Sequence, residues 1–235
     1  MGLADDVRTG LDGVLSPPWA SRNGTVVPET EDIVLRDGAV NIDATYLYAD
    51  LANSSALGQK IKPKIAAKVI RSYLNAATRI LRYYDGEIRS FDGDRVLAIF
   101  IGDSKNSNAV RSALALNWAV KKVLRPKLDD KWPDLSKTWT AYHGVGIDTG
   151  EAMLVRGGVR NNNDLISIGA APNVAAKLSE LRDAPDIYIT KAVYDRTAAS
   201  NKDATSGGSM WTRYGNVVVG ENSYVVYGSF WTWSP

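Results

Sequence analysis

The sequence predicts an α+β fold whose core elements follow the order strand, helix, strand, strand, helix, strand. Residues 44–50 are rich in aromatic and β-branched side chains and predict the first strand, while apolar residues three or four apart predict a long helix over residues 62–84. Asp92-Gly93 lies between two apolar runs and predicts a hairpin over residues 87–100. A second long helix, capped by Ser107 or Asn108, is predicted to run to about residue 124.

The segments around this core are predicted from the same kinds of pattern. Apolar residues three or four apart over residues 2–15 indicate a short amphipathic helix, and prolines and glycine make residues 16–43 an irregular arm with one short strand. We therefore expect an N-terminal helix and arm over residues 1–40 and one domain over residues 41–235. The remaining predictions are a polar connection over 125–137, strands over 139–147, 151–156, 164–168 and 186–190, helices over 172–181 and 192–197, and a C-terminal hairpin over 209–233.

The composition excludes several kinds of chemistry. The chain of 235 residues has no cysteine and one histidine, His143, which excludes disulfides and thiolate metal sites and argues against a Ser-His-Asp triad. Carboxylates are therefore the expected metal ligands. A net charge of +2 gives no strong attraction to nucleic acid or membranes, and no apolar run approaches the roughly 18 residues of a membrane span. The amphipathic N-terminus is unlike a signal peptide, so we expect a cytoplasmic protein.

Asp50 and Asp94 each lie where a predicted strand meets a turn. The order of the elements resembles the ferredoxin-like arrangement, in which the first strand and the following hairpin lie side by side. The two carboxylates can then approach one another, hold a pair of divalent cations and polarise a triphosphate. Taken singly, each aspartate also fits an ordinary turn or capping residue.

Asn173 and Lys177 are four residues apart and share one face of a predicted helix. An amide and a cation that project together toward a carboxylate–metal site suit a phosphoryl transition state. The alternative is that Asn173 caps the helix and Lys177 is a solvated surface charge.

Four groups of residues, in order and at fitting spacing, resemble motifs of the class III nucleotidyl cyclases along residues 44–200. They are Tyr46-Leu47-Tyr48-Ala49-Asp50, Gly93-Asp94 followed by Val96-Leu97-Ala98-Ile99-Phe100, Gly146-Ile147 with Gly150, and Gly169 followed by Asn173-Val174-Ala175-Ala176-Lys177-Leu178. The resemblance implies a homodimer with active sites shared between subunits and two Mn²⁺ or Mg²⁺ ions in each site. It also implies that Asp50, Asp94 and the carbonyl of Leu51 bind the metals and that Asn173 orients the ribose. Lys177 stands where the family generally has arginine, and lysine supplies the charge without the bidentate fork.

The residues that would read the base differ from those of purine cyclases. Ser90 and Ile166 stand where adenylate cyclases have lysine and aspartate and guanylate cyclases typically have glutamate and cysteine. Ile166 cannot accept a hydrogen bond from a purine amino group, and loss of such a partner removes discrimination of several kcal/mol. A pyrimidine, the smaller base, is therefore expected. Arg95 and Arg156 could contact phosphate or be solvated charges, and Tyr48 and Arg89 could line the base pocket.

The chain length, the N-terminal helix and arm, and the replaced pair Ser90 and Ile166 resemble the bacterial pyrimidine cyclases of Pycsar anti-phage systems. That resemblance implies a cytoplasmic, Mn²⁺-dependent enzyme whose cyclic UMP or cyclic CMP activates a separate effector protein. We prefer UTP on family frequency, with CTP as the alternative. A purine cyclase with a rebuilt pocket and a catalytically silent nucleotide-binding module remain alternatives. A diguanylate-cyclase-like enzyme is disfavoured by Arg95, where an acidic residue would be needed.

Overall fold

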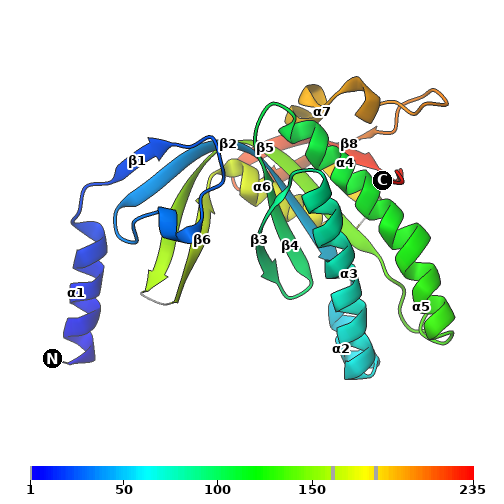
Figure 1. Cartoon of the computed structure of the whole chain (residues 1–235), viewed down its shortest axis with the longest axis horizontal. Helices are drawn as coiled ribbons and strands as arrows, with labels where there is room; N and C mark the ends of the chain where they lie inside the picture. Colours follow the sequence, from blue (N-terminus) through cyan, green and yellow to red (C-terminus); the bar gives the residue numbers. More distant parts are fainter. Residues whose placement is uncertain (1, 160–161, 183–184) are drawn as a thin grey trace.

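A computed structural model describes residues 2–159, 162–182 and 185–235. In these ranges nine strands form one mixed sheet in the order β3-β4-β2-β5-β7-β9-β8, with β1 added beside β2 and β6 beside β5 (Figure 1). The strands are β1 Ala20–Asn23, β2 Gly38–Leu51, β3 Glu87–Asp92, β4 Arg95–Phe100, β5 His143–Val159, β6 Asn162–Ile168, β7 Ile187–Thr190, β8 Thr212–Val219 and β9 Asn222–Ser229.

Helices α3, α4 and α6 cover the sheet, and α1 extends away from it (Figure 1). The helices are α1 Leu3–Leu15, α2 Ser54–Lys60, α3 Pro63–Tyr83, α4 Lys105–Trp118, α5 Arg125–Lys131, α6 Ala170–Ser179 and α7 Lys191–Arg196, with 3-10 turns η1 Thr30–Asp32 and η3 Ala199–Asn201 and the π-helical turn η2 Ala119–Leu124. The order β2, α3, β3, β4, α4, β5 confirms the predicted α+β arrangement. No helix within the described ranges is both long and apolar enough to cross a membrane.

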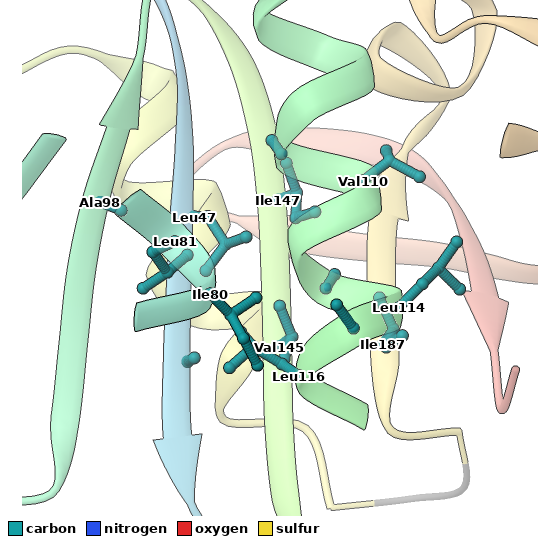
Figure 2. Packing of buried hydrophobic residues seen from close by; sticks show 14 of the residues in the cluster. Leu47, Ile80, Leu81, Ala98, Val110, Leu114, Leu116, Val145, Ile147 and Ile187 are labelled. Carbon is teal, nitrogen blue, oxygen red and sulfur yellow. The ribbon is translucent and has the colours of Figure 1, made fainter. Parts of the chain in front are cut away.

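The main core lies between the sheet and the two long helices α3 and α4. Figure 2 shows Ile80 and Leu81 of α3 and Leu114 of α4 packed against side chains of β2, β4, β5 and β7. The opposite face of β2 and β5 is covered by α6, whose Ala171 and Ala175 are buried with Tyr46 of β2. Burial on one face explains the predicted period of α3, and it is worth about 1.5–3 kcal/mol for each large side chain. Helix α4 differs, because every residue from Ser112 to Asn117 is buried.

Two predicted elements near the centre of the sheet are wrong. Residues 139–147 and 151–156 are not two strands around a turn, because β5 continues through Asp148-Thr149-Gly150. The whole of that stretch pairs with β2, from Leu51 opposite His143 to Ala39 opposite Val155. The Thr149 hydroxyl is also bonded within this ladder, because Thr45 Oγ1 donates to Thr149 Oγ1 at 2.9 Å. Continuous pairing with a long neighbouring strand therefore overrides local turn chemistry.

Several boundaries also differ from the prediction. The polar connection over 125–137 contains α5, which buries Leu128 and has Pro126 in its first turn, where proline is tolerated. The second long helix begins earlier, at Lys105, and continues through η2 directly into α5. The helix predicted over 172–181 is α6, shifted to Ala170–Ser179. Helix α2 was not predicted, because its seven residues bury only Leu57 and leave no clear period.

Candidate active site

Asp50 and Asp94 lie together at one edge of the sheet. The pairing of β2 with β4 puts Asp50 directly opposite Arg95, the residue after Asp94, and Gly93 makes the preceding turn at a φ of +61°. Burial raises the pKa of Asp94, and the negative charge of Asp50 raises it further. The two carboxylates are therefore close enough to repel one another, which is the arrangement that a divalent cation relieves.

The donors at this edge fit a hard cation. Asp94 Oδ2 is buried and accepts no hydrogen bond, and Leu51, whose carbonyl directly follows Asp50, is buried as well. Mn²⁺ and Mg²⁺ prefer oxygen ligands of this type. Among the residues that the structure describes, no third carboxylate or histidine completes a metal cluster. The remaining ligands would have to come from backbone, water and the phosphates of a substrate.

Asp50 is covered by two arginines in this structure. Arg182 Nη2 donates to Asp50 Oδ2, and Arg95 Nη2 lies 3.8 Å from the same oxygen. Arg95 also donates to Glu180 at 2.9 Å, and Glu180 lies 3.7 Å from Lys177 Nζ. An alternating row of charges therefore leads from Asp50 to the outer face of α6, and a metal ion on Asp50 would have to displace Arg182.

Sequence patterns do not reveal Arg182, because nothing around it forms a motif. It follows α6 in a polar loop, and only the tertiary contact with Asp50, 132 positions away, reveals it. Arg182 also lines a pocket of about 470 Å³ with Lys121, Arg125 and Asp186, in which Lys121 pairs with Asp186. Three cations against one carboxylate leave this pocket basic, which suits an anionic group such as phosphate.

Two glycines of β5 allow α6 to lie close to the sheet. A Cβ on Gly146 would be 2.1 Å from the carbonyl oxygen of Ala175, and one on Gly144 would be 2.4 Å from that of Ser179. The face of α6 that points away from the sheet carries Asn173 and Lys177, and both side chains are exposed. Asn173 Nδ2 donates a hydrogen bond to the Gly169 carbonyl at 3.1 Å. Among the residues that the structure describes, Lys177 is connected to Asp50 only through Glu180 and Arg95, so the role of Asn173 and Lys177 in a shared site stays a prediction.

A pocket of about 270 Å³ lies between the β3–β4 hairpin and β6 with the start of α6. The structure brings Ser90 and Ile166 together in its lining, with Tyr48, Arg89 and Asn173 beside them. The side chain of Arg89 is only 11% exposed, its Nη1 is 3.6 Å from Glu29 Oε2, and its buried Nε has no acceptor. A donor without an acceptor at the wall of a pocket suggests that a ligand supplies the acceptor.

Arg156 is not brought to either group of residues. It lies in β5 opposite Leu165 of β6, and its Nε donates to Asn163 Oδ1 at 2.7 Å. It lines neither the pocket with Ser90 nor the charge row at Asp50. A phosphate contact from Arg156 would therefore require a different arrangement, such as a second subunit placed against this strand.

His143 is a buried structural residue. Its Nε2 lies 3.2 Å from Asn117 Oδ1, Nδ1 has no partner, and the ring meets Tyr73 edge-on at 6.1 Å. Burial lowers the pKa of His143 to about 4, so the ring is neutral at physiological pH and buried away from solvent. This position agrees with the prediction of a strand residue.

We expect the stability of the folded chain to fall as the pH falls from about 6.5 to about 4, because the unfolded chain then binds a proton at His143 that the folded chain cannot bind. The pKa difference corresponds to roughly 3 kcal/mol, fully present above pH 6.5 and lost by pH 4. Urea unfolding at several pH values should show this loss, and His143→Gln should lack that part of it. An identical pH dependence in the two proteins would contradict the assignment.

Comparison with known proteins gives the family. No family model matches the chain. A uridylate cyclase from Rhodovulum sp. (strain MB263) is 39% identical over 234 residues, covering 98% of each chain. Uridylate cyclases from Xanthomonas perforans and Burkholderia cepacia are 36% and 38% identical and cover 99% and 90% of this chain and 99% and 91% of their own. The chain belongs to the uridylate cyclase family.

Solved structures agree on the fold. The adenylyl cyclase CyaB from P. aeruginosa superimposes with a TM-score of 0.68 at 22% identity, over 81% of this chain and 95% of that one. The guanylyl cyclase Cya2 superimposes with a TM-score of 0.66 at 18% identity, over 83% and 95% of the two chains. The predicted class III cyclase fold is therefore confirmed for this member of the uridylate cyclase family.

Proposed function

We propose that this protein converts UTP to 3′,5′-cyclic UMP and pyrophosphate. The observation that carries the proposal is the pair Asp50 and Asp94, in which one buried carboxylate oxygen has no partner among the described residues, together with a small pocket lined by Ser90, Ile166 and Asn173. Full-length relatives named uridylate cyclase support the same reaction.

Each residue has a chemical task in this reaction. Asp50, Asp94 and the carbonyl of Leu51 would hold two Mn²⁺ or Mg²⁺ ions, which would lower the pKa of the ribose 3′-hydroxyl and neutralise phosphate charge. Asn173 orients the ribose so that the 3′-oxygen lies in line with the α-phosphate. Lys177 stabilises the charge that develops there. The 3′-hydroxyl gives up its proton to solvent, its oxygen bonds to the α-phosphorus, the bond from the α-phosphorus to the leaving oxygen breaks, and pyrophosphate departs.

We place the complete site at the interface of a head-to-tail homodimer. The exposure of Asn173 and Lys177 on α6 supports this, because within the described residues neither side chain contacts Asp50 or Asp94 directly. A two-fold axis would bring the α6 face of one subunit to Asp50 and Asp94 of the other and would form two equivalent sites.

The biological setting follows from the resemblance to the Pycsar cyclases. We propose that residues 41–235 act as the catalytic unit in the cytoplasm, that infection by phage triggers synthesis, and that the cyclic nucleotide activates a separate effector protein. Phage challenge of cells that carry the gene with its neighbours, compared with an Asp50→Asn allele, tests this role.

The reaction is tested by incubating the protein separately with each of the four ribonucleoside triphosphates and Mn²⁺ and identifying products by mass spectrometry. We expect cyclic UMP to predominate. Predominant cyclic CMP would support the cytidylate alternative, a purine product would require a rebuilt purine pocket, and no product from any substrate would indicate a silent nucleotide-binding module.

A further inference from the structure

A basic groove with an apolar floor runs between α3 and the segment formed by η2 and α5. Its volume is about 740 Å³, and its floor includes Ala76, Ile80 and Leu124. Five cations line it, and no carboxylate does: Lys68, Arg71, Arg79, Lys127 and Lys131. In the part of the chain that the structure describes, none of these five side chains forms an ion pair. The groove is thus suited to an amphipathic and acidic occupant.

The chain itself contains a helix of that chemistry. Helix α1 has no buried residue, and its apolar residues Leu3, Val7, Leu11, Val14 and Leu15 form one stripe that is 51–79% exposed. Three aspartates and one arginine within Leu3–Leu15 give it a net charge of −2. An isolated helix of this length is marginal in water, and Gly10 and Gly13 each weaken it by about 1 kcal/mol. A stable α1 therefore needs a surface to cover its apolar stripe.

The groove of the same molecule is out of reach for α1. The two lie on opposite sides of the molecule, because α1 extends from β1 on one side and the helices α3 and α5 that form the groove lie on the other (Figure 1). The parallel pairing of β1 with β2 fixes the start of the connection, and Pro17-Pro18 stiffens it. The occupant that α1 could provide must therefore come from a second molecule.

The dimensions of helix and groove agree. The 13 residues of α1 span about 20 Å at 1.5 Å for each residue. Along α3 the groove extends from Lys68 to Ile80, which is about 18 Å on the same basis.

We propose that α1 of one molecule docks in the α3–α5 groove of a second copy, and that the second copy returns the same contact. Val7 and Leu11 face the apolar floor, and the aspartates of α1 lie among the lysines and arginines of the rim. Because the contact is reciprocal, it closes as a two-fold dimer and leaves neither helix nor groove uncovered. The proposed contact between α1 and the groove does not depend on which nucleotide binds at the active site.

Crosslinking tests the contact directly, because the natural chain has no cysteine. A chain that carries both Val7→Cys and Ala76→Cys should form a covalent dimer with a short bis-maleimide. The matched control carries Thr9→Cys, on the opposite face of α1, with Ala76→Cys, and should crosslink at least tenfold less. Crosslinking by Val7→Cys alone would indicate that two α1 helices pair with each other and would overturn the proposal.

Charge reversal supplies an independent readout. Arg71→Glu with Lys127→Glu should raise the dimer dissociation constant at least tenfold in sedimentation experiments at low salt, and Asp6→Lys with Asp12→Lys should restore association. Unchanged self-association in the groove variant, together with no crosslink at Ala76, would leave the groove to a different protein and would refute docking by α1. Cyclase assays on the same variants are a separate measurement and do not decide the outcome.

Discussion

Replacing Asp94 with asparagine is expected to reduce cyclic nucleotide synthesis by about 10³-fold or more while the metal-free protein becomes more stable. The amide keeps the shape of the side chain but removes one of two charges that hold the metals. Since burial and the charge of Asp50 both raise the pKa of Asp94, the ionised carboxylate costs free energy in the metal-free fold. Thermal unfolding in EDTA should therefore give a higher midpoint for Asp94→Asn, and the cyclase assay with Mn²⁺ should give almost no product.

The matched control is Asp92→Asn, which changes an exposed carboxylate two residues away on the same hairpin. It should retain activity and bind Mn²⁺ as the natural protein does, whereas Asp94→Asn should lose Mn²⁺ binding in a titration followed by electron paramagnetic resonance. An active Asp94→Asn variant with unchanged Mn²⁺ affinity would remove Asp94 from the metal site.

The two arginines beside Asp50 are expected to oppose metal binding at its carboxylate. Arg182 and Arg95 neutralise Asp50, so a metal ion would compete with these arginines for the Asp50 carboxylate. Arg182 also donates to the Ser179 carbonyl at 2.6 Å, which gives it a second partner when it leaves the carboxylate. In the proposed reaction a displaced Arg182 would be free to meet phosphate in the neighbouring basic pocket.

The sequence predicts those helices and strands whose local patterns, an apolar period or a turn dipeptide, agree with the final fold. The helix α3 has a clear apolar period, and Asp92-Gly93 fixes the β3–β4 hairpin, so the edge that holds Asp50 and Asp94 was predictable. The continuous β5 was not, because its middle contains turn residues and only the thirteen-position pairing with β2 keeps it extended.

Some polar and charged residues around the site can likewise be predicted from the sequence, and others cannot. Asn173 and Lys177 share a helix period and could be found from spacing alone. Arg182 and the unpartnered Nε of Arg89 depend on contacts between segments far apart in the chain, with Asp50 in one case and Glu29 in the other. No local pattern marks such residues, because each would look like a solvated charge in its own segment.

In the proposed reaction, Arg89 is the residue that we expect to favour uracil over cytosine. A guanidinium only donates hydrogen bonds, and its Nε is buried without an acceptor at the wall of the small pocket. Uracil presents a carbonyl at position 4 where cytosine presents an amino group, which is a second donor. A donor facing a donor leaves both unsatisfied, and such a mismatch in a buried site is worth about 1–3 kcal/mol.

Substituting Arg89 with glutamine should therefore lower the ratio of kcat/KM for UTP to that for CTP by roughly 10- to 100-fold, because an amide can either donate or accept. Competition assays with both substrates in one reaction measure this ratio directly and cancel any loss of active protein. Glu29→Gln is the control, since it removes the exposed carboxylate 3.6 Å from Arg89 and leaves the pocket wall intact, so the ratio should not change.

If Arg89→Gln loses activity equally on both substrates, Arg89 positions the hairpin and does not read the base. In that case the discrimination must lie with the other polar residues that line the pocket, which are Tyr48, Ser90, Asp164, Ser167 and Asn173.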